Sequence, residues 1–256
     1  MSLLRKFGVC CLVGLLGHAP ANAEWHYGLG TGIYALNIEG DAAFGTAASG
    51  TVDIENDLDS SELSDMLDSA RGLGGYATNG IWTIQASYGL VELENTFAGD
   101  GASLGGGALV AGSWERTQGE VAVSYNLFRE GRTTFGVIGG VRMTEHDFDL
   151  ATLNVQPGAA RNVDEDWTDV ILGVTHSYRL ADGWTWASRA HYGSGGSEGT
   201  PFANTGLRWQ AVNWLATTFY LQYEGVDFEE GNRGDVDYYA YDNDEFGAGI
   251  VLQLTW

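Results

Sequence analysis

The chain ends in a run that alternates between apolar residues and small or polar ones. In residues 246–256 (FGAGIVLQLTW), every second position is apolar, and glycine, valine, glutamine or threonine lies between. The apolar positions are Phe246, Ala248, Ile250, Leu252, Leu254 and Trp256. Because successive side chains of a β-strand point to opposite faces, this pattern predicts a strand with one continuous apolar face.

The same period of two recurs along most of the chain. It is present in 25–38, 81–93, 120–128, 135–146, 167–180, 184–192, 204–211 and 214–224. The chain has 38 glycines, 12% aromatic residues and only three prolines, a composition that suits long, closely spaced strands. We therefore expect an all-β fold.

The first 23 residues have the organisation of a secretory signal peptide. Arg5 and Lys6 precede a short apolar core, and Ala21-Asn22-Ala23 has the small-x-small pattern of a cleavage site. The apolar core is too short to span a membrane. We expect cleavage after residue 23 and a single domain over 24–256. Both cysteines, Cys10 and Cys11, lie in the leader, so the mature domain has no disulfide.

The charge of the predicted mature domain excludes one class of partner. Ten arginines, its only Lys or Arg residues, oppose 34 acidic residues and leave a formal charge of −24. Nucleic-acid binding needs a basic surface, so we expect no nucleic-acid partner. Nothing in the sequence indicates a cofactor.

An exported all-β chain is either a soluble β-protein or a transmembrane barrel, and periodicity alone does not separate the two. Three features favour the membrane. The apolar faces begin or end on aromatic residues, as at membrane interfaces. The polar faces carry charges of both signs, which a polar interior can pair. The connections alternate in length.

The connections predict the topology. Four are tight, at 78–80, 129–132, 181–183 and 211–213, and five are long, at 39–70, 95–104, 148–166, 194–203 and 226–244. Outer-membrane barrels have short periplasmic turns and long outer loops. We therefore predict an antiparallel up-and-down transmembrane barrel of ten strands, with both termini periplasmic. A break of 104–128 near 116–119 would change this number, so eight or twelve strands remain alternatives.

The last strand has a further predicted role. It must pair with the first strand to remove both edges of the sheet. Phe246, Ile250, Leu252, Leu254 and Trp256 resemble the C-terminal signal that the barrel-assembly machinery recognises. That machinery and the outer-membrane lipids, including lipopolysaccharide, are therefore expected partners.

Glycine-aromatic patterns over nearly the whole mature domain resemble a known family. They lie in 52–68 (VDIENDLDSSELSDMLD), 139–150 (GGVRMTEHDFDL), 167–193, 215–229 and the terminal strand. The chain is similar to a family of largely uncharacterised proteobacterial outer-membrane β-barrels, related to porin-like and opacity-type small barrels. The resemblance implies the fold and transfers no catalytic residue. The final Trp256 and the wholly arginine basic set depart from commoner members.

Seven charged residues are predicted to face the barrel interior: Arg142, Arg179, Arg189, Arg208, Asp169, Glu120 and Glu224. They are candidates for a charged constriction that selects solutes. The alternative is a salt-bridge network that fills a narrow barrel.

Residues 59–70 (DSSELSDMLDSA) carry the one helical signal. Leu63, Met66, Leu67 and Ala70 have helical spacing, and Asp59 with Glu62 suits a capping box. We expect a short helix in the first outer loop, acting either as a plug or as a local cap of the barrel.

Two other clusters are weaker candidates. Asp235, Asp237, Asp242 and Asp244 offer carboxylate oxygens to Ca²⁺, although without the spacing of an EF-hand. The alternative is a hydrated acidic loop that contacts lipopolysaccharide through divalent ions. For an enzyme, His146, Asp147 and Asp149 lie near the expected outer rim, and His191 faces the lumen. No hydrolase or phosphate-binding motif accompanies them, so we expect no catalytic site.

These patterns predict a narrow passive pore for small polar solutes in the Gram-negative outer membrane. The alternative is a non-conducting structural or surface-interaction barrel that acts through acidic outer loops.

Overall fold

The computed structural model describes residues 24–46, 50–58, 67–99, 108–152 and 160–256, so the predicted signal peptide lies outside the described residues. The regular elements of the described part are all strands. They are β1 (His26–Thr46), β2 (Gly50–Leu58), β3 (Leu67–Thr78), β4 (Trp82–Gly99), β5 (Ala108–Glu130), β6 (Thr133–Thr152), β7 (Ala160–Ala181), β8 (Trp184–Gly195), β9 (Thr200–Val212), β10 (Leu215–Glu230) and β11 (Tyr239–Thr255).

Ten of these strands form a closed antiparallel barrel, as predicted. β1 and β3 to β11 pair in sequence order, and β11 returns to β1 from Gly28↔Thr255 up to Phe44↔Tyr239. The backbone N–H of Tyr27 donates to the carbonyl of Trp256 at 2.8 Å, and the N–H of Trp256 donates back at 3.1 Å. β5 is continuous, so no break near residues 116–119 alters the number of strands. The terminal run thus closes the barrel and removes both sheet edges.

Much of what the sequence suggested to be outer loop is strand. The predicted loop 39–70 was wrong over its first half, because β1 continues to Thr46 and returns as β2, with pairs from Ile38↔Leu58 to Thr46↔Gly50. β2 is the eleventh strand and pairs only with β1 in the described part. Other strands also run well past their predicted outer ends. Continued pairing satisfies backbone groups that a loop would leave to water.

The predicted helix over 59–70 is contradicted at its C-terminal end. Leu67 and Ala70 belong to β3, where they pair with Leu93 and Val91 of β4. Inter-strand backbone hydrogen bonds with β4 replace the helical i→i−4 hydrogen bonds that the spacing of the apolar residues suggested. Leu63 and Met66 lie outside the described residues. No helix in the described part is long and apolar enough to cross a membrane.

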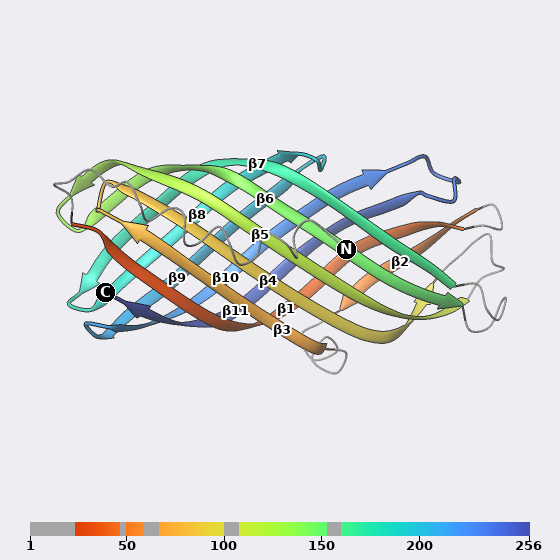
Figure 1. Ribbon diagram of the computed structural model, residues 1–256, viewed down its shortest axis with the longest axis horizontal. Helices are drawn as coiled ribbons and strands as arrows, with labels where there is room; N and C mark the ends of the chain where they lie inside the picture. Colours follow the sequence, from red (N-terminus) through yellow and green to blue (C-terminus); the bar gives the residue numbers. More distant parts are fainter. Residues whose placement is uncertain (1–23, 47–49, 59–66, 100–107, 153–159) are drawn as a thin grey trace.

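An apolar belt surrounds one end of the barrel. The tight turns and the C-terminus lie at this end (Figure 1). Outward-facing side chains there are strongly exposed, with Ile33 at 71%, Leu172 at 68% and Leu221 at 62%. The C-terminal residues Phe246, Ile250, Leu252, Leu254 and Trp256 face outward in the same belt. Aromatic pairs such as Trp184 with Trp209, stacked at 5.7 Å, lie beside the tight turns. Such a belt with aromatic borders is the lipid-facing surface of a membrane barrel.

Above the belt, the apolar residues change faces. In β1, Leu29 and Ile33 face outward, whereas Leu36 and Ile38 are buried inside the barrel. β6, β7, β10 and β11 show the same change along their length. The strands therefore continue past the membrane as an outer extension with an apolar interior and a polar exterior, the arrangement of a water-soluble barrel. In Figure 1 the β1–β2 hairpin lies in this extension, opposite the C-terminal end.

Candidate functional site

Four of the predicted lumen charges meet in the middle of the barrel. Arg142 donates from Nη1 to Oε1 of Glu224 at 2.5 Å and from Nη2 to Oε2 of Glu120 at 3.0 Å. Arg189 donates from Nη2 to Oε1 of Glu120 at 2.6 Å. Arg142 is only 3% exposed and Glu224 only 1%. These ion pairs thus connect opposite walls of the lumen, because their residues lie on β5, β6, β8 and β10.

The sequence reasoning missed the other half of this network. Arg116 forms a buried ion pair with Glu245, and the Tyr241 hydroxyl donates to the same carboxylate at 3.2 Å. Gln118 donates from Nε2 to Glu224 at 2.9 Å. The signal was available, because Arg116 and Gln118 share the lumen-facing phase of Glu120 in β5, and Glu245 shares the phase of Gly247 in β11.

The resulting lumen network is electrically balanced. Its three arginines, Arg116, Arg142 and Arg189, face three glutamates, Glu120, Glu224 and Glu245. The ring of Phe202 lies under two of the guanidinium groups, 4.9 Å from Arg142 and 5.3 Å from Arg189. Buried charges persist only when they are paired. Each of these six groups is paired, although Nε of Arg142 and Oε2 of both Glu224 and Glu245 have no hydrogen-bond partner among the described residues.

The other three predicted lumen charges lie apart from this network. Asp169 accepts hydrogen bonds from the backbone N–H of Ser197 at 2.9 Å and from its hydroxyl at 2.8 Å. This carboxylate therefore fixes the β8–β9 connection. Arg179 and Arg208 lie on lumen-facing positions of β7 and β9, toward the tight turns.

The interior of the outer extension is filled by an aromatic and aliphatic core, hereafter the outer core. Trp167 of β7 stacks on Phe228 of β10 with ring centroids 4.2 Å apart. Trp114 and His146 meet edge to face at 5.4 Å. The buried members are Leu36, Ile38, Ala42, Phe44, Val52, Ile54, Val91, Leu93, Trp114, Val163, Trp167, Val226, Phe228, Tyr239 and Tyr241. Protein cores of this kind are close-packed, so the outer core fills the interior of the outer extension above the lumen network.

The residues considered for an enzyme do not assemble. His146 has no exposed surface, and its Nδ1 is 2.8 Å from the Tyr239 hydroxyl inside the outer core. Burial holds the pKa of its imidazole well below the usual range, so the ring is neutral. Asp147 and Asp149 are on the opposite, outward face of β6. Because successive side chains of β6 point to opposite faces, the imidazole of His146 lies on the other face of the strand from both carboxylates.

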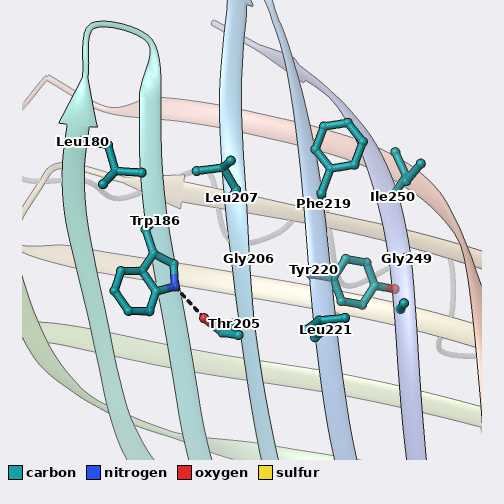
Figure 2. Close-up of a pocket in the computed structure, with 11 residues that line it drawn as sticks. Leu180, Trp186, Thr205, Gly206, Leu207, Phe219, Tyr220, Leu221, Gly249 and Ile250 are labelled. Carbon is teal, nitrogen blue, oxygen red and sulfur yellow. Dashed lines mark hydrogen bonds between the residues drawn. The ribbon is translucent and has the colours of Figure 1, made fainter.

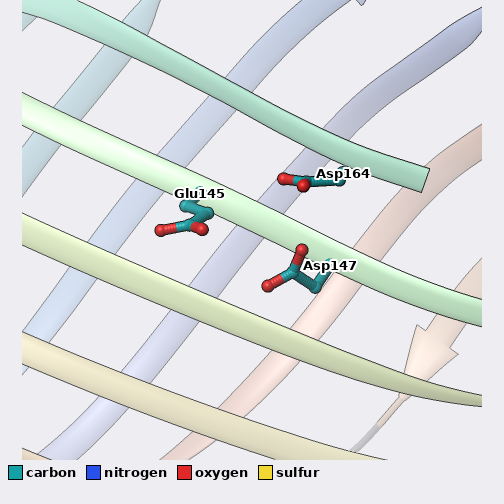
Figure 3. Close-up of side chains that lie close together, drawn as sticks. All are labelled: Glu145, Asp147 and Asp164. Carbon is teal, nitrogen blue, oxygen red and sulfur yellow. The ribbon is translucent and has the colours of Figure 1, made fainter. Parts of the chain in front are cut away.

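A row of carboxylates crosses the exterior of the outer extension. Glu92, Glu115, Asp147 and Asp164 are successive cross-strand neighbours on β4, β5, β6 and β7. Oxygens of Glu145, Asp147 and Asp164 lie within 4.8 Å of one another (Figure 3). Partial burial and these neighbouring carboxylates raise the pKa of Asp147 to about 6. Protonation or a divalent cation would relieve the repulsion between them.

The Ca²⁺ candidate from the sequence does not form such a group. Asp242 and Asp244 face outward on β11, where Asp242 lies opposite Asp41 and Asp227. Asp235 and Asp237 lie in the connection before β11. Within the described ranges, the group in which three carboxylates converge is Glu145, Asp147 and Asp164 instead.

A groove of about 660 Å³ crosses the lipid-facing belt over β8 to β11 (Figure 2). Leu207, Phe219, Leu221 and Ile250 line it, and Trp186 donates from Nε1 to the Thr205 hydroxyl at 2.5 Å beside it. Its position and apolar lining suit lipid acyl chains.

Comparison with solved structures finds outer-membrane barrels. The outer-membrane protease OmpT of Escherichia coli aligns with a TM-score of 0.59 at 11% identity, over 91% of this chain and 96% of OmpT. Ail, the attachment invasion locus protein of Yersinia pestis, aligns at 8% identity over 91% and 99% of the chains, with a TM-score of only 0.34. No protein-family model and no curated protein sequence matches the chain. At these identities the likeness concerns the fold alone: the chain has the closed ten-stranded barrel fold of Gram-negative outer-membrane proteins.

Proposed function

We propose that this protein is a non-conducting outer-membrane barrel that acts through its outer surface. The observation that carries this proposal is the outer core, which occupies the lumen where a pore would have to continue. This favours the alternative over the passive pore that the sequence first suggested. The balanced lumen network beneath the outer core supports the same conclusion, because its arginines are already neutralised by glutamates and are poorly placed to select solutes.

The outer extension supplies the surface that would act. It places rows of carboxylates on outward-facing strand positions above the lipid-facing belt. The aromatic pair Tyr223 and Phe246, 5.0 Å apart, marks the upper border of the belt beside β10 and β11. Lipopolysaccharide head groups would contact the barrel at this height, and divalent cations would bridge their phosphates to the carboxylates. Lipopolysaccharide is therefore the partner that we propose for this surface.

Planar-bilayer recording of the refolded mature chain, residues 24–256, tests the proposal. Folding is checked first by heat-modifiable migration on a gel. We expect no discrete conductance steps from the native chain. The matched variant Trp167→Ala/Phe228→Ala removes the stacked pair that crosses the outer core.

Steps from the double variant alone would identify the outer core as the seal. Discrete steps from the folded native chain, lost or altered in Arg142→Ala, would refute the proposal and restore the pore hypothesis.

A further inference from the structure

The arginines of the lumen fall into two sets that differ in their surroundings. Arg116, Arg142 and Arg189 are all in the lumen network, where each is paired with a glutamate. Arg179 and Arg208 lie between that network and the tight turns. Among the described residues, neither of these two arginines forms an ion pair with a carboxylate.

Arg179 and Arg208 share one row across three strands. Arg179 of β7 is the cross-strand neighbour of Thr185 of β8, and Thr185 is the neighbour of Arg208 of β9. Thr218 of β10 continues the row beyond Arg208. Two strand spacings, about 10 Å, separate the backbones of the two arginines. Their long side chains and the two hydroxyls can therefore converge on one ligand.

The lumen wall around this row carries no negative charge on its strands. Below Glu120, Glu224 and Glu245, the lumen-facing strand positions in the described part hold small and polar residues and the buried Ile138 and Ile171, but no carboxylate. Arg179 is exposed and Arg208 half-buried, so solvent at the turn end reaches both. At the adjoining turns, Arg129 and Arg132 are offset by Glu130 and Asp182, so the positive charge of this end lies on the lumen wall. A chain with 34 acidic residues thus keeps an unbalanced positive lumen at one end.

We propose that the row Arg179, Thr185, Arg208 and Thr218 is an anion-binding site open to the periplasm. The tight turns place this end of the barrel on the periplasmic side. Guanidinium groups bind phosphate and carboxylate in a bidentate manner, and the threonine hydroxyls supply further donors. The ligand is a soluble oxyanion, because the arginines face the lumen rather than the lipid. The low-dielectric barrel wall focuses their field on an anion that enters from below.

The site goes beyond the proposed outer-surface function and does not depend on it. The lumen network closes the barrel above the site, and the outer core blocks the lumen further up. The anion is therefore bound and released on the same side.

The test uses the refolded mature chain in zwitterionic detergent, with inorganic pyrophosphate as the probe. Arginine Nε–H resonances are followed by NMR during the titration. We expect saturable shifts of the Arg179 and Arg208 signals, which are assigned from the variants Arg179→Gln and Arg208→Gln. The double variant should raise the Kd at least tenfold, and added salt should weaken binding to the native chain. Arg233→Gln is the matched control, because Arg233 pairs with Asp53 on the outer extension.

Shifts that do not saturate, or equal binding by the native chain and the double variant, would overturn the proposal. A second titration, in bilayer nanodiscs, distinguishes a soluble oxyanion from a lipid headgroup as the ligand. If phosphatidylglycerol alone shifts the two signals and abolishes pyrophosphate binding, the ligand is a lipid headgroup, and the soluble-oxyanion assignment is wrong. Unchanged pyrophosphate binding in those nanodiscs supports it.

Discussion

Removing one arginine from the lumen network should destabilise the barrel far more than removing one from its surface. Arg142→Met keeps the length of the side chain but deletes the hydrogen bonds to Glu120 and Glu224, at 3.0 and 2.5 Å. Breaking a buried pair by deleting one partner costs about 3–5 kcal/mol. Glu120 keeps Arg189 and Glu224 keeps Gln118, so we expect the lower end, about 3 kcal/mol.

Two further variants test whether the loss of stability in Arg142→Met comes from unpaired buried charge. Arg233→Met breaks the Arg233–Asp53 pair, whose side chains are 59% and 45% exposed, and should cost about 0–1 kcal/mol. Arg142→Met/Glu224→Gln restores the balance of the lumen network and should recover at least about 1 kcal/mol relative to Arg142→Met, because neighbouring sites couple.

The free energy of unfolding is measured by urea titration in lipid vesicles, with tryptophan fluorescence as the signal. If Arg142→Met costs no more than Arg233→Met, the lumen network is not a compensated buried cluster. If the double variant is less stable than Arg142→Met, lost packing rather than unpaired charge explains the effect.

Two other predictions concern the ends of the barrel. The raised pKa of Asp147, about 6, means that the folded state binds this proton more tightly than the unfolded state, so this group stabilises the fold as the pH falls from 7.5 to 5. Asp147→Asn should remove that contribution together with any stabilisation by Ca²⁺ at pH 7.5; an equal difference from the native chain at both pH values would contradict this. Deleting Trp256 removes both backbone bonds to Tyr27 and the ring stacked at 6.1 Å, whereas Trp256→Ala removes only the ring. The deletion should therefore give the smaller heat-modifiable, folded fraction, and equal fractions would show that backbone closure at this residue is unimportant.

The number of strands and their order followed from the sequence because both depend on local signals. Alternation identifies nine of the ten barrel strands, and the tight turn at 78–80 implies the tenth before it. The turns at 78–80 and 181–183 carry Asn-Gly and Asp-Gly dipeptides that favour hairpins. In a membrane barrel each strand pairs with its sequence neighbours, so order requires no long-range information beyond closure. The Gly28↔Thr255 pairing supplies that closure.

What the sequence did not indicate is how far the strands continue and which charges meet. The β1–β2 hairpin was missed because acids such as Asp41 and Asp53 lie in 39–58, where the strand signal was apolar alternation. On the exterior of the outer extension such acids face water or, like Asp53, pair with an arginine. Which lumen charges form ion pairs with each other was missed for another reason. Arg142 reaches Glu224 across the barrel from β6 to β10, and such contacts depend on barrel diameter and stagger, which no single strand encodes.

The change of face by the apolar residues connects these observations to function. While apolar residues point outward, as Leu29 and Ile33 do, the surrounding solvent is lipid and the lumen is polar. Where they turn inward, as Leu36 and Ile38 do, water surrounds the barrel and the apolar residues must fill it. The point at which the apolar residues of a strand change face therefore marks the membrane border. Above that point, the same apolar residues fill the lumen. In the function that we propose, a barrel closed in this way offers solutes no path, and its chemistry is confined to its two accessible ends: the acidic exterior of the outer extension and the positive lumen around Arg179 and Arg208.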